Sequence, residues 1–150
     1  MRYTEILLNG QKFQMPAISL GTVWFGSKTT KEMSHAMMDT YTGLGGNWID
    51  TARLYGYPCF PEQELKEKYD SEEVIGEWMK SRGNRNEITL ITKGANTDMR
   101  TGKTNRLTPE DIRSDIETSL KALQTSWTDL YFLHTAQLHL LLFLLYNKYN

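Results

Sequence analysis

Apolar and polar positions near the start of the chain predict a β-hairpin. Tyr3–Leu8 and residues 12–15 predict two strands, and Asn9 and Gly10 lie between them. An Asn-Gly pair is typical of a two-residue hairpin turn, because both residues tolerate a positive φ. Residues 17–25 predict a further strand.

Three later segments have the spacing of amphipathic helices. Residues 29–44, 71–80 and those from 108 to 123 place apolar side chains three or four positions apart, as on one helix face. The side chains expected to be buried are Met33, Ala36, Met37, Tyr41 and Leu44 in the first helix, Val74, Ile75, Trp78 and Met79 in the second, and Ile112, Ile116, Leu120 and Leu123 in the third.

Start and stop signals support these helices. Ser71 is expected to be the N-cap of the second helix, and Thr108 followed by Pro109 begins the third. Gly45 and Gly83 are expected to end the first and second helices.

Short apolar runs at residues 47–51, 87–92 and 129–134 predict strands that alternate with these helices. Alternating strands and helices predict right-handed βαβ units and a parallel sheet, so the expected fold class is α/β. No low-complexity linker divides the 150 residues, which indicates one domain.

Composition narrows the function. The chain is 39% hydrophobic and 23% charged, which provides enough apolar side chains for a core. Its net charge is -1, from 17 basic and 18 acidic residues, and no basic stripe suggests a nucleic-acid partner. The residue pattern suggests no metal site.

The single cysteine, Cys59, cannot form an internal disulfide, which fits a reducing compartment. A surface-loop thiol is favoured there over a nucleophile. The N-terminus does not resemble a signal peptide. The longest apolar run, residues 138–146, is nine residues with His139 inside it, whereas a membrane helix needs roughly 20. A soluble, cytoplasmic chain is therefore expected.

Three predicted strands end in a titratable residue. Asp50, Lys93 and His134 stand 43 and 41 residues apart, about one βα unit each, and Tyr55 follows Asp50 closely. The carboxyl ends of parallel strands meet at one edge of the sheet, where active sites form. Taken singly, Asp50 could cap a turn, Lys93 could be solvated, His134 could be structural and Tyr55 could be a packing aromatic. Several polar residues at one sheet edge are costly unless they are paired, and this favours a shared site.

Together these four residues suit the reduction of a carbonyl group. Hydride addition to the carbonyl carbon leaves an alkoxide that needs a proton. Tyrosine can donate one, but its unperturbed pKa of about 10 makes it a weak acid near neutrality. A nearby ammonium group favours the phenolate and so strengthens the acid. Asp50 would hold Lys93 in place, and His134 would orient the substrate oxygen.

The motifs around these residues resemble those of the aldo-keto reductase family. Gly46 to Gly56, with Asp50-Thr51-Ala52 and then Tyr55, is similar to the family signature, and Ser71 to Gly76 resembles its second part. The segments ending at Lys93 and at His134 are similar to the strands that carry the family lysine and histidine. Leu20 to Trp24 resembles the end of the family's first strand. The match runs from about residue 3 to residue 135.

The resemblance implies a (β/α)8 barrel of the TIM type, of which the chain carries the hairpin and the first four β/α units. It implies NADPH as cofactor and aldehydes or ketones as substrates. By position, Tyr55 is the expected proton donor, supported by Asp50, Lys93 and His134. The expected cofactor contacts are Gly21, Thr22, Val23 and Asp50, and the expected substrate contacts are Trp24 and His134.

Two segments depart from the family pattern. Residues 57–70 separate the two parts of the signature with fourteen residues, six of them charged. A solvated insertion is favoured over a lid, since loops tolerate insertions at little cost. Residues 1–137 are expected to form the half-barrel, and residues 138–150 an aberrant apolar tail, which could also be a buried element covering the sheet.

A full barrel needs about 250 residues. In the family, the later strands bind the carboxamide, the pyrophosphate and the adenosine 2′-phosphate of the cofactor. An alternative is therefore a catalytically inactive fragment that acts, if at all, by associating with another chain. Self-association through open sheet edges is also expected.

Overall fold

The computed structural model describes residues 1–8, 10–59, 67–104 and 106–135. Within these ranges the chain forms a two-stranded antiparallel sheet and a four-stranded parallel sheet with three α-helices. The elements, in chain order, are β1 (Tyr3–Leu8), β2 (Gln11–Pro16), β3 (Leu20–Gly21), α1 (Lys31–Gly43), β4 (Trp48–Asp50), the 3-10 turn η1 (Tyr57–Cys59), α2 (Ser71–Arg82), the 3-10 turn η2 (Arg85–Glu87), β5 (Thr89–Gly94), α3 (Pro109–Ala122) and β6 (Leu130–Leu133).

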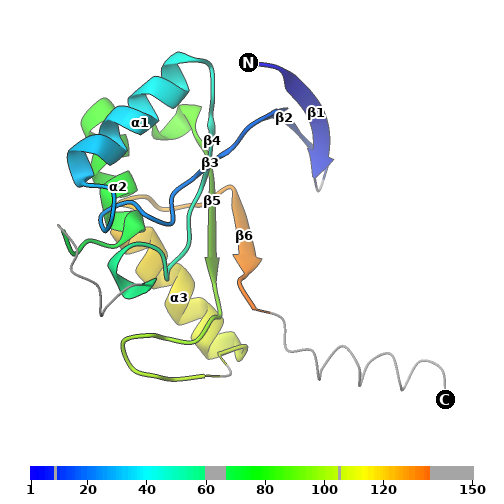
Figure 1. The fold of residues 1–150 in the computed structure, drawn as a ribbon. Coiled ribbons are helices and arrows are strands. Elements are labelled where there is room, and N and C mark those ends of the chain that lie inside the picture. Colours follow the sequence, from blue (N-terminus) through cyan, green and yellow to red (C-terminus); the bar gives the residue numbers. More distant parts are fainter. Residues whose placement is uncertain (9, 60–66, 105, 136–150) are drawn as a thin grey trace.

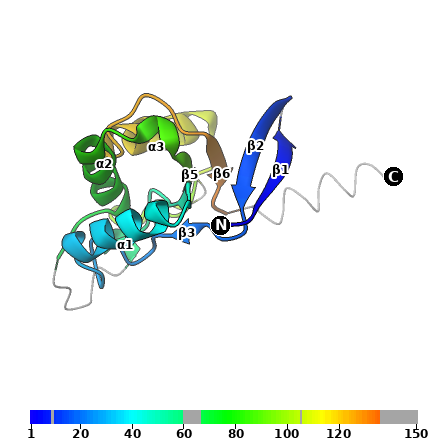
Figure 2. The same ribbon diagram turned by 90° about the horizontal axis from the view of Figure 1, so that it is seen from above.

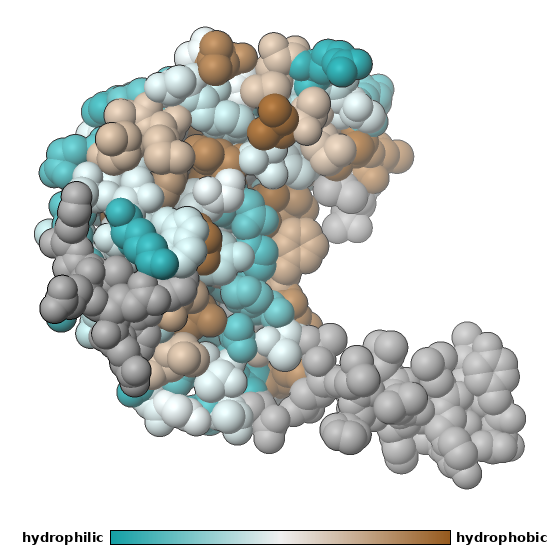
Figure 3. Space-filling view, viewed as in Figure 1, coloured by the Kyte–Doolittle hydropathy of each residue, from teal (hydrophilic) through white to brown (hydrophobic). Residues whose placement is uncertain are grey.

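The predicted parallel sheet is confirmed. Its strand order is β3-β4-β5-β6, each neighbouring pair is parallel, and one α-helix follows each of the first three strands along the chain. The three helices lie together on one side of the sheet (Figures 1 and 2). On the opposite side the surface is hollowed beside the hairpin (Figure 3). Because the four strands are parallel, their carboxyl ends all lie at one edge of the sheet.

The hairpin forms as predicted, with Tyr3 paired with Pro16 at its open end. Gly10 has a φ of +79°, as the predicted turn requires, whereas Asn9 lies outside the described residues. Trp48, at the start of β4, donates from Nε1 to the carbonyl of Gln14 at 3.1 Å and packs edge-on against Phe13. The hairpin thus lies at the amino end of the parallel sheet, opposite the predicted site.

The core fills the space between the helices and the sheet. Its largest fully buried side chain is that of Trp78, on α2. Burial of such a side chain contributes about 1.5–3 kcal/mol. All four positions predicted to be buried in the second helix are buried. The core cluster consists of Phe25, Met38, Ile49, Val74, Ile75, Trp78, Met79, Ile88, Leu90 and Leu123.

The prediction of one strand over residues 17–25 is wrong in extent. Only Leu20–Gly21 is a strand, because the chain then turns: the amide of Phe25 donates to the carbonyl of Thr22 at 3.0 Å. Phe25 is nevertheless 2% exposed. A buried turn thus produced the apolar signal that suggested a strand. The strand predicted at 87–92 is also shifted, since η2 occupies Arg85–Glu87 and β5 begins at Thr89.

The buried face predicted for the first helix is wrong except at Tyr41, which is buried as predicted. Met33 and Leu44 are 57% and 68% exposed, and Met37 is 40% exposed. The buried positions are Ser34, Met38 and Tyr41. Ser34 can be buried because its hydroxyl donates to the carbonyl of Thr30 at 2.8 Å. A polar residue therefore occupies the face of the helix that points to the core, and apolar residues lie on the exposed face.

The third helix shows a larger departure of the same kind. Asp111, Asp115 and Ser119 are its most buried helical positions, while the predicted Ile112, Ile116 and Leu120 are half-buried. The reason is electrostatic, because the inward carboxylates meet basic partners such as Arg106. Leu123, which follows the helix, is fully buried as predicted.

Helix ends agree in part with the sequence signals. Thr108 caps α3 by accepting the amide of Asp111, and Gly83 ends α2 in the left-handed region, as predicted. The N-cap of α2 is Asp70 and not Ser71, so that prediction is wrong. The amide of Asp70 donates to Glu73 Oε2 at 3.1 Å, which leaves Ser71 as the first residue of the helix.

Residues 60–66 of the insertion and the predicted tail at residues 138–150 lie outside the described part of the chain. The roles predicted for them stay predictions. Among the described helices, none combines the length and the apolar character that a membrane span requires.

Candidate active site

The carboxyl edge of the parallel sheet brings the predicted residues together. Asp50 is the last residue of β4, Lys93 the penultimate residue of β5, and His134 directly follows β6. The amide of His134 continues the sheet by donating to the carbonyl of Gly94 at 2.8 Å. Strand register alone therefore places these three residues at one edge.

The Lys93 ammonium is the centre of the site. Its Nζ donates to Asp50 Oδ1, to the carbonyl of Thr51 at 2.9 Å and to the hydroxyl of Tyr55 at 3.3 Å. The side chains of Lys93 and Asp50 are 16% and 30% exposed. Partial burial strengthens this pair relative to a surface ion pair. Two oxygens thus hold the ammonium beside the Tyr55 hydroxyl.

The backbone on both sides of Tyr55 is fixed. Its amide donates to the carbonyl of Ala52, and its carbonyl accepts the amide of Ser71, both at 3.0 Å. Gly56 follows with a φ of +87°, and a Cβ there would lie 2.6 Å from the Ser71 nitrogen. Only glycine fits this crossing. The start of α2 therefore sets the position of Tyr55.

Ser71 also ties together the ends of β3 and β4. Its hydroxyl lies 2.8 Å from Thr22 Oγ1 and 2.9 Å from the carbonyl of Thr22, and 3.1 Å from Thr51 Oγ1. Thr22 in turn donates to the carbonyl of Asp50 at 3.0 Å. Sequence reasoning missed this role of Ser71, although its place in the second motif was the signal.

His134 lies on the other side of Tyr55. The two rings meet edge-on, with centroids 5.6 Å apart and an interplanar angle of 81°. Burial lowers the pKa of His134, and the Lys93 ammonium lowers it further. A neutral imidazole carries one N–H, which can donate to a substrate oxygen. Its Nδ1 is buried and has no hydrogen-bond partner among the described residues.

The residues predicted to contact cofactor lie at the ends of β3 and β4 but differ in access. Gly21 is exposed, while Val23 and Asp50 are partly exposed. Thr22 is fully buried, and its hydroxyl bonds to Asp50 and Ser71. Trp24, predicted to contact substrate, lies in the turn after β3 and is 38% exposed, with the Lys28 ammonium 3.9 Å from its ring centre.

This arrangement has a definite chemical capability. A phenol hydroxyl within reach of a held ammonium can release a proton, because the ammonium stabilises the phenolate. An uncharged imidazole beside it can orient the oxygen that receives the proton. The geometry thus suits proton transfer to a developing alkoxide.

The sequence matches a known protein family and named proteins. The family model for the aldo/keto reductase family matches residues 17–139. An aryl-alcohol dehydrogenase [NADP(+)] of Phanerodontia chrysosporium is 32% identical over an alignment of 139 positions, which covers 85% of this chain and 33% of that protein. A norsolorinic acid reductase of Emericella nidulans is 32% identical over an alignment of 151 positions, which covers 88% of this chain and 35% of that protein.

A solved structure supports the predicted fold class. The holo form of an aldo-keto reductase from Bacillus halodurans has a TM-score of 0.69 and 25% identity, covering 93% of this chain and 42% of that one. The parallel strands and helices thus form part of a (β/α)8 barrel. The chain spans about a third of the length of its curated relatives. With the family model matching most of its residues, the chain belongs to the aldo/keto reductase family.

Proposed function

We propose that this chain carries the proton-donating part of a site for the NADPH-dependent reduction of aldehydes or ketones to alcohols. The observation that carries the proposal is the contact between the Tyr55 hydroxyl and the Lys93 ammonium at 3.3 Å. Tyr55 is the proton donor, while Asp50, Lys93 and His134 support it.

Each residue has one task in this proposal. His134 donates a hydrogen bond to the carbonyl oxygen of the substrate. The Tyr55 hydroxyl gives its proton to that oxygen as negative charge develops there. The phenolate that remains is stabilised by Lys93, which Asp50 and the carbonyl of Thr51 hold in place. General acid catalysis of this kind contributes roughly 10²- to 10⁴-fold to a rate.

The residues at the ends of β3 and β4 fit a cofactor. A Cβ added at Gly21 would meet nothing within 4 Å, so the surface there is open. The partly exposed carboxylate of Asp50 can accept hydrogen bonds from ribose hydroxyls. NADPH supplies the hydride when it is bound. Gly21, Val23 and Asp50 would hold its nicotinamide end. Thr22 would keep Asp50 in position through the hydrogen bond from its hydroxyl to the Asp50 carbonyl.

The names of the relatives support a substrate class for this proposal. One is named for the oxidation of aryl alcohols with NADP(+), which is the reverse of aryl aldehyde reduction. An aromatic aldehyde is therefore the first substrate to test.

The experiment supplies the part of the barrel that the match does not cover. Residues 17–135 replace the matching segment of the Bacillus halodurans reductase, and loss of NADPH absorbance is followed with an aromatic aldehyde. We expect turnover that Tyr55→Phe lowers by about 10²-fold or more. Tyr57→Phe, at a neighbouring tyrosine outside the site, serves as the control. A chimera that binds NADPH and is equally active with either substitution would refute the assignment of Tyr55.

A second candidate function is association with another chain without catalysis. Its support is that β6 lies at one edge of the described sheet, where Phe132 and Leu133 are 50% and 54% exposed. Unpaired strand edges and contiguous apolar surface favour pairing with another chain. The chimera separates the two functions, because an associating but inactive segment would not support turnover.

A further inference from the structure

A buried carboxylate on α3 takes no part in the proposed chemistry. Asp115 is 1% exposed, and both of its oxygens are engaged. Its Oδ1 accepts Arg106 Nη2 at 2.7 Å, and its Oδ2 accepts Arg106 Nη1 at 2.9 Å. Arg106 is itself 8% exposed, and Asp115 raises its pKa. Such a two-pronged pair has a fixed geometry.

Asp115 also reaches the backbone of the site. Its Oδ2 accepts the amide of Ala95 at 2.8 Å. Ala95 is 3% exposed and has a φ of +64°. This left-handed conformation is unfavourable for a residue with a Cβ, and it persists only where its surroundings hold it. The hydrogen bond from the Ala95 amide to the Asp115 carboxylate stabilises this conformation.

The turn at Ala95 is joined directly to the catalytic residues. Lys93 lies two positions before it, and the carbonyl between them, that of Gly94, accepts the amide of His134 at 2.8 Å. A Cβ at Gly94 would lie 2.9 Å from the Cβ of Asp115 and 2.1 Å from the Tyr131 hydroxyl. The helix therefore approaches the strand end so closely that only glycine fits. A shift of Asp115 is thus transmitted to the backbone that carries Lys93 and His134.

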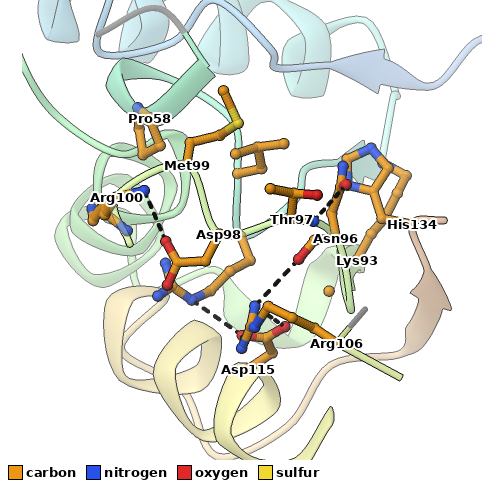
Figure 4. A pocket seen from close by; sticks show the side chains of 13 residues that line it. Pro58, Lys93, Asn96, Thr97, Asp98, Met99, Arg100, Arg106, Asp115 and His134 are labelled. Atoms are coloured by element: carbon orange, nitrogen blue, oxygen red, sulfur yellow. Dashed lines mark hydrogen bonds and ion pairs between the residues drawn. The ribbon is translucent and has the colours of Figure 1, made fainter. Parts of the chain in front are cut away.

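A pocket beside Lys93 and His134 shows the same relation. Asp115 and Arg106 form part of its wall, opposite Met99 and Pro58 (Figure 4). Arg53 lies on this wall as well, with its Nε 3.7 Å from Asp115 Oδ1, and its amide donates to the carbonyl of Lys93 at 3.0 Å. Asp115 therefore contacts Arg53, whose backbone bonds to Lys93, and also Ala95, which lies two positions after Lys93.

We propose that Asp115, fixed by Arg106, is a positioning residue that sets the relative placement of Lys93 and His134 by holding Ala95 in its left-handed turn. This inference rests on the proposed function for its catalytic meaning. Its structural content is independent of turnover, so it is tested by a measurement that needs neither cofactor nor substrate.

The test is NMR spectroscopy of the 150-residue chain with Asp115→Asn. The variant keeps the size of the side chain and one oxygen but removes the charge. Exchange of the Ala95 amide should accelerate by roughly tenfold or more, because a hydrogen bond to a charged acceptor is weakened. Asp39→Asn is the matched control: Asp39, on α1, also pairs with an arginine through both oxygens, at 3.1 and 2.8 Å from Arg82, and it does not bond to Ala95.

The titration of His134 provides a second readout with a diagnostic sign. Burial and Lys93 keep the pKa of His134 low. If Asp115 positions the segment, Asp115→Asn loosens it, and the pKa rises toward its ordinary value. If Asp115 acted only through its negative charge, removing that charge would lower the pKa instead. Ala95→Gly in the same background should bring the low pKa back, because glycine adopts a positive φ without strain.

Three outcomes would overturn the inference: an unchanged Ala95 exchange rate, a pKa of His134 that falls, or no restoration by Ala95→Gly. If Asp115→Asn does not fold, the unaltered chain still decides, because its Ala95 amide must then be protected relative to that of exposed Thr104. Equal exchange at the two amides would contradict the proposal. An inactive chimera with these NMR effects intact would refute the proposed function alone.

Discussion

The hydroxyl of Tyr55 lies 3.3 Å from the ammonium of Lys93, although 38 residues separate them in the sequence. Strand register brings Lys93 to the edge of the sheet, and the bond from the Ser71 amide to the Tyr55 carbonyl brings the tyrosine over it. The ammonium therefore depends on Asp50 and Thr51 for its place, while the hydroxyl depends on the start of α2.

Removing the ammonium is expected to disable the proton donor. In the chimera, Lys93→Met keeps the length of the side chain but leaves the phenolate without a counter-charge. We expect kcat to fall by about 10²- to 10⁴-fold, with a smaller change in KM, since the ammonium acts on the transition state. Steady-state NADPH oxidation measures this. Lys80→Met, at an exposed position of α2, should leave kcat unchanged; similar losses in both variants would point to damage to the fold.

The stability of the chain should depend on pH through Glu72. This carboxyl is 1% exposed on α2, and its Oε1 accepts a hydrogen bond from the hydroxyl of Thr92 at 2.5 Å. Burial raises the pKa of Glu72 from 4.5 to about 7. In the folded chain the group therefore keeps its proton up to about pH 7, whereas in the unfolded chain it loses the proton near its ordinary pKa. Stability should fall as the pH rises between these two values.

A pKa of about 7 in place of 4.5 corresponds to roughly 3 kcal/mol, lost across this window. Glu72→Gln should remove this part of the pH dependence of the free energy of unfolding, measured in urea at about pH 5 and about pH 8. Glu117→Gln, at an exposed position of α3, is the control and should retain it. The same pH dependence in wild type and Glu72→Gln would mean that the Glu72 carboxyl titrates normally.

Much of this fold could be predicted from the sequence, because its local signals and long-range packing agree. The strand ends at Asp50, Lys93 and His134 were found from apolar runs alone, since a parallel sheet forces such ends to one edge. The buried face of α3 could not be found in this way. Asp115 and Asp111 point inward because Arg106, which lies outside the helix, provides the positive charge that pairs with their carboxylates. Hydrophobic periodicity carries no information about such pairs.

The turn after β3 was missed for a related reason. Phe25 is buried although its backbone is not extended, so its apolar character resembled that of a strand residue. The role of Ser71 depends on three oxygens from two other strand ends. Contacts of this kind come from tertiary structure and leave no local pattern beyond the motif itself.

Replacing Gly56 with alanine should lower the free energy of unfolding more than the same change at Gly83, which has a similar backbone conformation. Both Gly56 and Gly83 have a positive φ, of +87° and +64°, but a Cβ at Gly83 would meet nothing within 4 Å. Gly83→Ala should therefore cost only the left-handed conformation, about 1–2 kcal/mol. Gly56→Ala adds a clash with the backbone of Ser71 and should cost more and lower activity in the chimera. Equal losses of unfolding free energy in urea would refute this account.

The 150-residue chain is expected to associate with itself. Within the described residues no strand pairs with the outer edge of β6, and the side chains of Phe132 and Leu133 are exposed there. Light scattering at micromolar concentration should detect species larger than a monomer. Phe132→Lys should shift the distribution toward the monomer, whereas Met99→Lys, at an exposed loop position, should not. A monodisperse monomer with cooperative unfolding would contradict the prediction.

A polypeptide of these 150 residues alone is expected to reduce aldehydes far more slowly than the chimera. The four side chains of the proposed site are in place, so an argument from the site alone would predict activity. Hydride transfer also requires the nicotinamide within van der Waals range of the carbonyl carbon, and a misplacement of about 1 Å can cost roughly 10²-fold. The resemblance to the family implies that binding of the phosphates and adenine provides much of this placement, through later strands that the match does not include. Tyr55→Phe should therefore have little effect in the 150-residue chain but a large effect in the chimera, with NADPH oxidation measured side by side. Robust turnover by the 150 residues, abolished by Tyr55→Phe, would show instead that the described strand ends hold the cofactor by themselves.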